Sequence, residues 1–434
     1  MKPIRIGLLG LGVVGGGVWT VLAQNGDEIT RRAGRRVEVA AVAVRDVAKA
    51  RALVGDAVTV TNDGMALALD PDIDIIVELM GGDTLARDCI LAAIDQGKHI
   101  VTANKALLAV HGNEIFAAAQ ARGVMVAFEA AVAGGIPIIK AIREGLTANR
   151  IQWVAGIING TTNFILSEMR QRGLPFAEVL AEAQRLGYAE ADPTFDIEGV
   201  DAAHKLTLLA SLAFGIPVQF DKATTEGLPG LASEDILHAA RLGYRIKLLG
   251  ITRRRPDGIE LRVHPTLVPE DCLLANVEGA MNAVLVRGDV VGLSMYYGQG
   301  AGALPTASAV VADLVDVARL QMADPEHRVP HLAFQPDAMV DIPILPMAEV
   351  RSSFYLRLRV DDRPGVLADL ARILSGAGIS VGSMFQQPHG DRQADIIFLT
   401  HEAREGDVDT ALQAMQAQPF VRSDVTRLRV ENLS

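Results

Sequence analysis

The sequence predicts a mixed α/β protein in three parts, and three observations support this prediction. Buried-type apolar runs alternate with helix-forming segments over residues 1–136, which is typical of a doubly wound parallel sheet. The period changes over residues 137–302, which indicates an α+β middle domain. Residues 351–434 follow a β-α-β-β-α-β order, which is ferredoxin-like. We expect residues 321–350, which contain several prolines, to be a linker, and a helix near 303–320 to return to the first part.

Length and composition exclude several classes of protein. The 434 residues leave room for about three domains at ~150 residues each. Half of the residues are hydrophobic and 21% are charged, which is unlike a disordered chain. The net charge of −11 argues against nucleic-acid binding, because that binding depends on Lys and Arg neutralising phosphates. No apolar stretch approaches ~18 residues without a charge or a Gly/Pro break, so we expect no membrane span.

The cysteines and the start of the chain bear on its location. Cys89 and Cys272 fit neither a zinc spacing nor a disulfide framework. Met1 leads directly into a strand, without a signal-peptide layout. We therefore expect a cytoplasmic protein.

A glycine-rich motif follows the first strand, Ile4 to Leu9, and precedes helix-compatible sequence. Its residues are Gly10, Leu11, Gly12, Val13, Val14 and Gly15. Gly10 permits the tight turn, Gly12 lets backbone N–H groups approach a pyrophosphate, and Gly15 lets helix and strand pack closely. In this context the motif predicts a Rossmann-like domain that binds NAD or NADP. An ordinary glycine-rich turn is the alternative.

The end of the second strand bears on the choice between the two dinucleotides. The strand runs from Val37 to Val44, and Arg45 follows where NAD-specific sites usually place an acid. A guanidinium can pair with a 2′-phosphate, which favours NADP and leaves NAD possible. As a solvated loop charge, Arg45 would carry no such preference.

Four residues follow the carboxyl ends of further predicted strands, where ligands of such sheets bind. They are Gly81, Thr102, Lys105 and Glu129. By position alone, Lys105 is equally a candidate for a surface lysine at a helix start. The strands themselves are nearly continuous apolar runs, as expected where helices cover both faces of a parallel sheet.

A charged pair at the start of an apolar helix is the most informative feature of the middle part. Asp201 and Lys205 stand at positions i and i+4, so they share one helix face. On an exposed helix they would form a weak stabilising pair, but residues 202–213 are nearly all apolar, which marks the helix as buried. Buried charges are costly unless they are paired or used, so we predict a role in proton transfer for this pair. We expect His204 to be a packing or surface residue.

Two loops in the middle part precede predicted helices. Thr161 or Thr162 is expected to cap the helix from Phe164 to Gln171. A second glycine-rich loop, residues 298–302, begins another helix and either closes over the cofactor or simply connects the middle part back to the first.

Together these motifs resemble homoserine dehydrogenase over essentially the whole chain. The markers are residues 10–15, 101–105, 129–137 and 159–163 and, most specifically, 187–190 with Asp192, Pro193, Asp196, Gly199, Asp201 and Lys205. The tail is similar to an ACT domain, whose Asp-x-x-Gly turn is matched by residues 362–365.

The resemblance implies reversible, NAD(P)H-dependent reduction of L-aspartate 4-semialdehyde to L-homoserine, in threonine, methionine and isoleucine biosynthesis. It implies that Lys205 donates the proton, that Asp201 orients Lys205 or the substrate, and that Lys105 contacts cofactor and substrate. Glu190, with Asp196 and Asp201, would hold the substrate ammonium.

The resemblance also implies further ligand contacts. Gly187 and Gly302 would line the nicotinamide side of the cofactor. A monovalent cation such as Na+ would bind the Glu129 carboxylate and three backbone carbonyls. Those carbonyls belong to Val132, Gly134 and Ile136.

The tail implies regulation and assembly. We expect an amino-acid effector such as threonine at the ACT domain, near Asp362 and Gly365, and a homodimer or homotetramer. Two alternatives remain at this point: another ACT-regulated amino-acid dehydrogenase, or an amino-acid sensor without catalysis. An NADPH-consumption assay with aspartate semialdehyde would distinguish the three.

Overall fold

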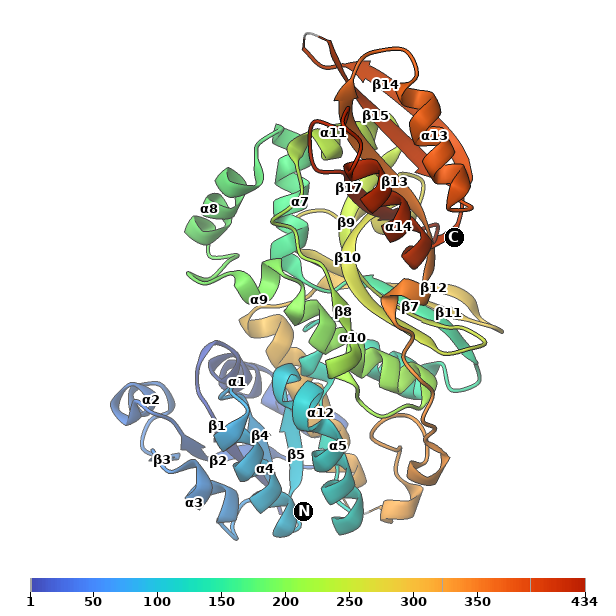
Figure 1. Ribbon diagram of the computed structural model, residues 1–434. Helices are drawn as coiled ribbons and strands as arrows, with labels where there is room; N and C mark the ends of the chain where they lie inside the picture. Colours follow the sequence, from blue (N-terminus) through green and yellow to red (C-terminus); the bar gives the residue numbers. More distant parts are fainter. Residues whose placement is uncertain (1, 322, 391, 434) are drawn as a thin grey trace.

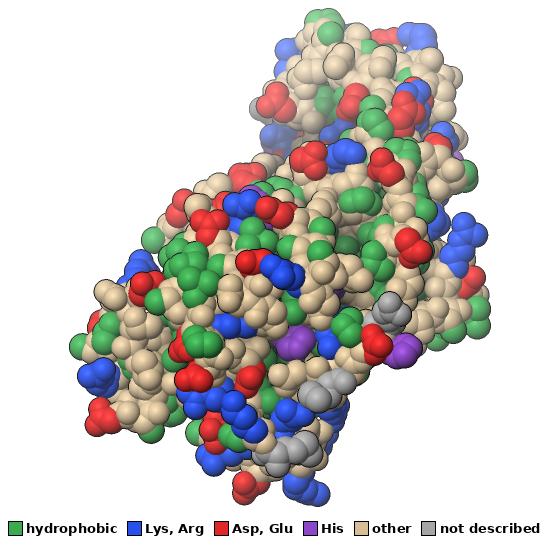
Figure 2. Space-filling view, turned by 90° about the horizontal axis from the view of Figure 1, so that it is seen from below, with side chains coloured by type: hydrophobic (Ala, Val, Ile, Leu, Met, Phe, Trp, Pro, Cys, Tyr) green, Lys and Arg blue, Asp and Glu red, His purple; other side chains and the backbone are tan. Residues whose placement is uncertain are grey.

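The computed structural model describes residues 2–321, 323–390 and 392–433. The three parts lie along one long axis, with the N-terminal part at one end, the C-terminal part at the other and the middle part between them (Figure 1). No helix among the described residues is long and apolar enough to cross a bilayer. Where Figure 2 views the molecule from below, basic and acidic side chains are interspersed rather than segregated.

The first part is a doubly wound parallel sheet in the order β3-β2-β1-β4-β5-β6. Its strands are β1 (Ile4–Leu9), β2 (Val37–Ala43), β3 (Thr59–Thr61), β4 (Ile75–Glu78), β5 (His99–Thr102) and β6 (Val126–Ala127). Its helices are α1 (Val13–Ala33), α2 (Val47–Val54), α3 (Gly64–Leu69), α4 (Thr84–Asp95) and α5 (Lys105–Arg122), joined by the returning helix α12 (Ala303–Leu320). Gly17 lets α12 approach α1 closely, since a Cβ there would lie 2.5 Å from the Ala303 carbonyl oxygen.

The middle part and the C-terminal part share one 11-stranded sheet, whose main path runs β12-β11-β7-β9-β10-β17-β13-β15-β14. The strands of the middle part are β7 (Ile151–Ile157), β8 (Thr224–Thr225), β9 (Tyr244–Arg254), β10 (Ile259–Pro269), β11 (Met281–Gly288) and β12 (Gly292–Gln299). Its α-helices are α6 (Ile138–Lys140), α7 (Gly160–Arg172), α8 (Phe176–Leu186), α9 (Thr194–Ile197), α10 (Val200–Phe214) and α11 (Ser233–Arg241).

The C-terminal part follows the predicted β-α-β-β-α-β order, with a two-residue strand added. Its elements are β13 (Arg351–Asp361), α13 (Val366–Gly376), β14 (Val381–Pro388), β15 (Gln393–Thr400), β16 (Ala403–Arg404), α14 (Glu405–Gln416) and β17 (Thr426–Val430). The sequence predicts that the tail is a separate module. In the structure its sheet continues the sheet of the middle part. β17 pairs in parallel with β10 at two residue pairs, Thr266 with Arg429 and Leu267 with Val430.

The predicted linker forms short 3₁₀ turns. It begins against the first part, where Arg328 donates to the Gly123 carbonyl at 2.7 Å, and then runs along the middle part. The Val340 amide donates to the Gly215 carbonyl at 2.8 Å, and the amides of Ile259 and Leu345 donate to the Pro343 and Ile259 carbonyls at 2.9 and 2.8 Å. Such backbone bonds hold the segment against the domain that it leaves.

Candidate active site

Helix α10 brings one carboxylate between two lysines. It follows Gly199, whose φ of +81° favours glycine at the sharp turn from α9. The Lys205 ammonium donates to Asp201 Oδ2 at 2.6 Å and to the Ile158 carbonyl at 2.8 Å. Lys105 Nζ, from the first residue of α5, lies 3.3 Å from Asp201 Oδ1. The first and middle parts therefore meet at Asp201.

Burial and charge pull the pKa values of this cluster in opposite directions. Burial alone would raise the pKa of Asp201, but Lys205 and Lys105 lower it to about 2. Burial also lowers the pKa of Lys205 from its ordinary value; Asp201 opposes that shift and Lys105 adds to it. A lysine whose ammonium form is destabilised in this way is a better proton donor.

Asn159 ties a second carboxylate to the first. Its side-chain nitrogen donates to Asp196 Oδ1 at 2.7 Å and to Asp201 Oδ2 at 2.8 Å. Burial, followed by the nearby charge of Asp201, raises the pKa of Asp196. One amide therefore holds together two carboxylates that would otherwise repel each other.

Asn159 also corrects the expected cap of α7. The sequence predicts this cap at Thr161 or Thr162, but Asn159 makes it: Asn159 Oδ1 accepts the Thr162 amide at 2.9 Å. The Thr161 hydroxyl instead donates to the Tyr188 carbonyl at 2.6 Å, which ties the segment after α8 to α7. Asn159 directly precedes the helix, so its residue type was the signal for the cap; nothing local indicated its two carboxylate partners.

The acidic segment before α10 is only partly gathered into this cluster. Asp196 joins it through Asn159, whereas Glu190 is exposed and the hydrogen bond at that residue is made by its backbone carbonyl, which accepts from Gln184 at 3.1 Å. Phe195, also exposed, lies beneath Lys105, with Nζ 5.7 Å from the ring centroid. His204 packs against Phe195 and Phe220 with ring centroids 5.3 and 4.2 Å away, so the expected packing role is confirmed.

The glycine motif leaves an open cradle at the start of α1. Gly10 has φ +102°, and a Cβ there would lie 2.8 Å from the Leu79 carbonyl oxygen. A Cβ at Gly15 would lie 2.4 Å from the Gly10 carbonyl oxygen, so helix and strand could not pack as they do. Gly12 has open space around it, and no described side chain caps the first turn of α1. This cradle fits a pyrophosphate of a dinucleotide.

A buried carboxylate joins two neighbouring strand ends of the first part. Glu78 accepts the Thr102 hydroxyl at 2.7 Å and the amides of Met80 and Gly81 at 3.0 and 3.1 Å. Burial raises the pKa of Glu78 despite these bonds. The Asn104 side chain donates to the Gly82 carbonyl at 2.7 Å and accepts from the Leu107 amide, capping the helix that presents Lys105. Glu78 was not predicted as a site residue, because the side chain that it bonds, Thr102, lies 24 residues away in the sequence.

Arg45 is exposed just beyond β2. The neighbouring Asp46 caps α2 by accepting the Lys49 amide at 3.0 Å. Arg45 follows the carboxyl end of β2, the edge of the sheet at which folds of this topology bind the ribose of a dinucleotide.

Glu129 is buried among backbone donors. Its two carboxylate oxygens accept the Ile139 and Lys140 amides, each at 2.9 Å, and its own amide donates to Asp313 at 2.8 Å. Burial raises the pKa of both carboxyl groups, that of Asp313 to about 7. A buried carboxylate with backbone partners suits a monovalent cation coordinated by carbonyls. Among the residues with described side chains, no cluster of three His, Cys, Asp or Glu offers a metal site.

Ala133, which lies between two of the predicted carbonyl ligands, and Gly134, which is one of them, both have positive φ, at 54° and 43°. The Ile136 carbonyl already accepts the Ile138 amide at 2.8 Å, which leaves one of its lone pairs for an ion.

Gly187 and Gly302 both stand at helix ends. Gly187 ends α8 with φ +80°, and Gly302 precedes α12 with φ +119°. A side chain at either position would be strained, and a backbone without one allows a flat ring to approach closely.

The residues predicted for the effector lie at the start of α13. Gly365 precedes this helix with φ +96°, and a Cβ there would meet no atom within 4 Å. The Asp362 side chain accepts from Gln386 of β14 at 3.2 Å. The turn is exposed and leads from β13 into α13, and its bond to Gln386 links it to the edge strand β14.

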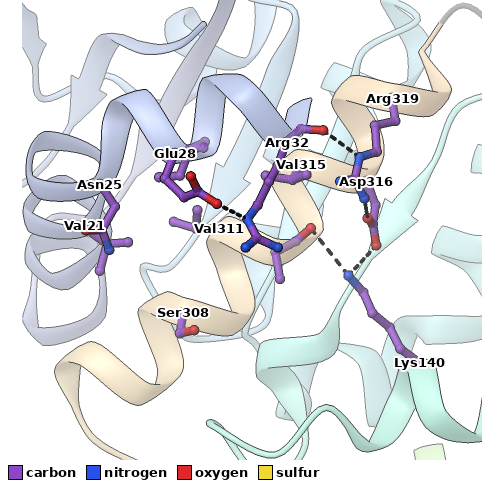
Figure 3. A pocket seen from close by; sticks show the side chains of 12 residues that line it. Val21, Asn25, Glu28, Arg32, Lys140, Ser308, Val311, Val315, Asp316 and Arg319 are labelled. Atoms are coloured by element: carbon purple, nitrogen blue, oxygen red, sulfur yellow. Dashed lines mark hydrogen bonds and ion pairs between the residues drawn. The ribbon is translucent and has the colours of Figure 1, made fainter. Parts of the chain in front are cut away.

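A groove of about 470 Å³ lies between α1 and α12, away from these residues (Figure 3). Its charged side chains satisfy one another: Arg32 pairs with Glu28 at 2.8 Å, and Asp316 pairs with Arg319 and Lys140. None of the predicted site residues lines it.

Comparisons with known proteins agree with the architecture. Residues 10–129 match the family model "Homoserine dehydrogenase, NAD binding domain", residues 137–315 match "Homoserine dehydrogenase", and residues 354–420 match "ACT domain". Homoserine dehydrogenases of Pseudomonas aeruginosa and Neisseria gonorrhoeae are 60% and 56% identical, with both chains covered completely.

Solved structures give the same result. A homoserine dehydrogenase from Thiobacillus denitrificans is 64% identical, covers 100% of this chain and 99% of its own, and superposes with a TM-score of 0.96. One from S. aureus is 34% identical with complete coverage of both chains and a TM-score of 0.78. With its NAD(P)-binding domain and its ACT domain, the chain therefore belongs to the homoserine dehydrogenase family of oxidoreductases that act on CH–OH groups.

Proposed function

We propose that the lysine-flanked Asp201 is the centre at which L-aspartate 4-semialdehyde is reduced to L-homoserine. Bound NAD(P)H supplies the hydride to the aldehyde carbon. Lys205 then gives its proton to the alkoxide oxygen, and the resulting amine is reprotonated from solvent. The short contact from Lys205 to Asp201, inside a helix end that is otherwise apolar, is the observation that carries this proposal.

Asp201 and Lys105 have supporting roles in the proposed reaction. The Lys205 ammonium donates hydrogen bonds to both Asp201 and the Ile158 carbonyl, and these two bonds hold it in one position. The proton that Lys205 transfers therefore has a defined direction. Lys105 reaches the same carboxylate from the nucleotide-binding part and would stabilise negative charge on the substrate oxygen. Asp196 and the exposed Glu190 would hold the substrate ammonium, with Asn159 keeping Asp196 in place.

The dinucleotide proposed is NADP, with NAD also accepted. The motif from Gly10 to Gly15 would hold the pyrophosphate, while Gly81, Thr102, Gly187 and Gly302 would line the rest of the cleft. The support for NADP is the exposed Arg45 beyond β2, where its guanidinium can reach a 2′-phosphate.

A Na+ ion is proposed at Glu129 and the carbonyls of Val132, Gly134 and Ile136. The buried Glu129 carboxyl beside Asp313 supports it, because burial raises the pKa of both groups and a bound cation would offset the cost of ionising Glu129. The ion would neutralise that charge and brace the junction between the first and middle parts.

The proposed assembly is a homodimer or homotetramer, regulated by an amino acid such as threonine near Asp362 and Gly365. Exposed apolar side chains on two edge strands support oligomerisation; they include Tyr297 of β12 and Phe385 of β14. The free thiols of Cys89 and Cys272 support a location in the reducing cytoplasm.

An activity assay tests the proposal directly. Purified chain is mixed with aspartate semialdehyde and either NADPH or NADH, and nucleotide oxidation is followed with and without NaCl and threonine. We expect turnover with both nucleotides, a lower KM for NADPH, activation by Na+ and inhibition by threonine. Binding of nucleotide without turnover would contradict the proposed reaction; turnover with no effect of threonine would contradict only the regulation.

A further inference from the structure

Arg429 joins the C-terminal part to the middle part through two carboxylates. It lies on β17 and is 1% exposed. Its guanidinium donates to Glu405 of α14, within its own module, with the Nε bond at 2.9 Å. It also donates to both carboxylate oxygens of Glu226, at 2.6 and 2.8 Å, and Glu226 belongs to the middle part. Such bidentate pairing fixes the relative position of two groups as well as attracting them.

The segment that carries Glu226 packs against the joint between α9 and α10. The Leu228 amide donates to the Ile197 carbonyl at 2.9 Å. A Cβ at Gly227 would lie 2.6 Å from that same carbonyl oxygen and 2.7 Å from Glu198 Cα, so the two backbones are in direct contact. At Gly199 a Cβ would lie 3.8 Å from the Glu226 carbonyl oxygen. A displacement of Glu226 therefore reaches this joint without an intervening flexible side chain.

The joint lies between the two carboxylates of the site. Asp196 immediately precedes Ile197, the last residue of α9, and Asp201 is the second residue of α10. Asn159 requires a fixed separation of these carboxylates, because one side-chain nitrogen donates to both, at 2.7 and 2.8 Å. A change of angle at the joint would lengthen one of these bonds.

We propose that Glu226 and Arg429 are positioning residues, through which the C-terminal module sets the spacing of Asp196 and Asp201. The pair touches neither substrate nor cofactor; it acts through the backbone of residues 226–228 on the joint at residues 197–199. This inference rests on the proposed function, because it assigns Asp196 to substrate binding. It predicts that the pair governs substrate affinity more than nucleotide affinity.

A second ion pair across the same boundary provides a matched control. Arg357 of β13 donates to both oxygens of Asp235 at 2.5 and 2.9 Å, and the Tyr355 hydroxyl donates to the same residue at 2.8 Å. Asp235 lies on α11, which carries none of the predicted site residues. Glu226→Gln and Asp235→Asn each remove one carboxylate charge at this boundary with little change of shape.

The experiment measures KM for the semialdehyde, KM for the nucleotide, kcat and Tm for the full-length wild type and both variants. We expect Glu226→Gln to raise KM for the semialdehyde about fivefold or more, the lower end of typical coupling between sites. Nucleotide KM should stay at the wild-type value. Asp235→Asn should lower Tm at least as much as Glu226→Gln does, while it leaves the KM for the semialdehyde and the KM for the nucleotide unchanged. Glu226→Asp keeps the charge but shortens the side chain, so it should raise the KM for the semialdehyde less than Glu226→Gln does. It replaces Glu226→Gln in the test if that variant does not fold.

Equal KM values for the semialdehyde in wild type and the Glu226 variants would overturn the inference. So would an equal rise in Asp235→Asn, since the effect would then be a general loosening of the boundary. Both outcomes require an active wild type, so they are distinct from a failure of the proposed function, in which the wild type itself would show no turnover.

Discussion

Asp201 shows how far a single residue can determine the chemistry of its neighbours. Two ammonium groups within 3.3 Å keep it ionised although it is 4% exposed. A buried ion pair is weak evidence for stability, because desolvation offsets the attraction. Its place at the meeting point of two domains is better explained by proton transfer than by holding the fold together.

Removing the proposed donor tests that interpretation. Lys205→Met should lower kcat by about 10²–10⁴-fold, the usual contribution of a general acid, while circular dichroism shows an intact fold. Glu168→Gln is the control, because it breaks an exposed i,i+4 pair with Arg172 at 3.1 Å. The control should keep full activity. Wild-type turnover in Lys205→Met would assign the proton to another group.

The pH dependence of reduction gives a second test at this scale. Lys205 must be protonated to donate, so kcat/KM should fall at high pH, and burial places this fall below the pH of an ordinary lysine titration. Lys105→Met removes a positive neighbour that lowers the pKa of Lys205. The alkaline fall should therefore move to higher pH in this variant, even though its activity is lower. A fall that stays in place, or moves to lower pH, would show that another group titrates.

At the scale of one element, the connection from β7 to α7 does two tasks at one residue. Asn159, which follows the end of β7 at Ile157 by two residues, caps the helix and holds two carboxylates. Its neighbour Ile158 supplies the carbonyl that accepts from Lys205. The glycine that follows is required by packing, since a Cβ at Gly160 would lie 2.7 Å from the Ala280 carbonyl oxygen.

Asn159→Ala should separate these tasks. Loss of the cap should lower the free energy of unfolding by about 1 kcal/mol. Loss of the two carboxylate bonds should in addition raise KM for the semialdehyde. Asp63→Ala is the control for the loss of a cap alone, because Asp63 caps α3 by accepting the Ala66 amide at 2.9 Å, whereas the carboxylate bonds belong to Asn159. A variant of Asn159 that loses stability but keeps its KM would reduce this residue to a helix cap.

Local elements were the predictable level of this structure. The strand Ile4–Leu9 has the predicted bounds, because an apolar run and the glycine that ends it act within a few residues. The i,i+4 pair of Asp201 and Lys205 was visible for the same reason. Asn159 and Glu78 were not identified as site residues, because their contacts with Asp196, Asp201 and Thr102 span 24 to 42 residues and leave no local pattern.

At the scale of the whole molecule, the shared sheet joins the C-terminal part and the middle part into one structural unit. Arg262 of β10 is 1% exposed and donates to Glu431, just beyond β17, at 2.6 Å. The Glu431 amide donates to the Leu267 carbonyl at 3.0 Å. The sequence could not show this pairing, since a two-residue parallel contact between strands about 160 residues apart has no signature in either strand.

Deleting residues 351–434 should therefore destabilise the remainder rather than release an unregulated enzyme. The deletion removes β17, the strand that pairs with β10, and it leaves Arg262 without the Glu431 carboxylate. We expect a lower Tm and aggregation, followed by differential scanning fluorimetry and size-exclusion chromatography. Glu431→Gln tests the ion pair alone and should lower the free energy of unfolding by about 2 kcal/mol. This loss is smaller than that of a fully broken buried pair, because Glu260 still binds Arg262. A stable, fully active truncated chain would contradict this expectation.

The position of β17 also has a consequence for biosynthesis. It lies between β10 and β13 in the long sheet, although it is the last strand of that sheet in chain order. A ribosome delivers the N-terminal segments first, so β10 and β13 each keep one unpaired edge until residues 426–430 have emerged. The emergence of β17, rather than that of β10 or β13, is therefore the step that completes the sheet. A premature stop just before Thr426 would leave one edge of β10 and one edge of β13 unpaired. Unpaired strand edges favour aggregation, so we expect chaperones and proteases to act on such a chain.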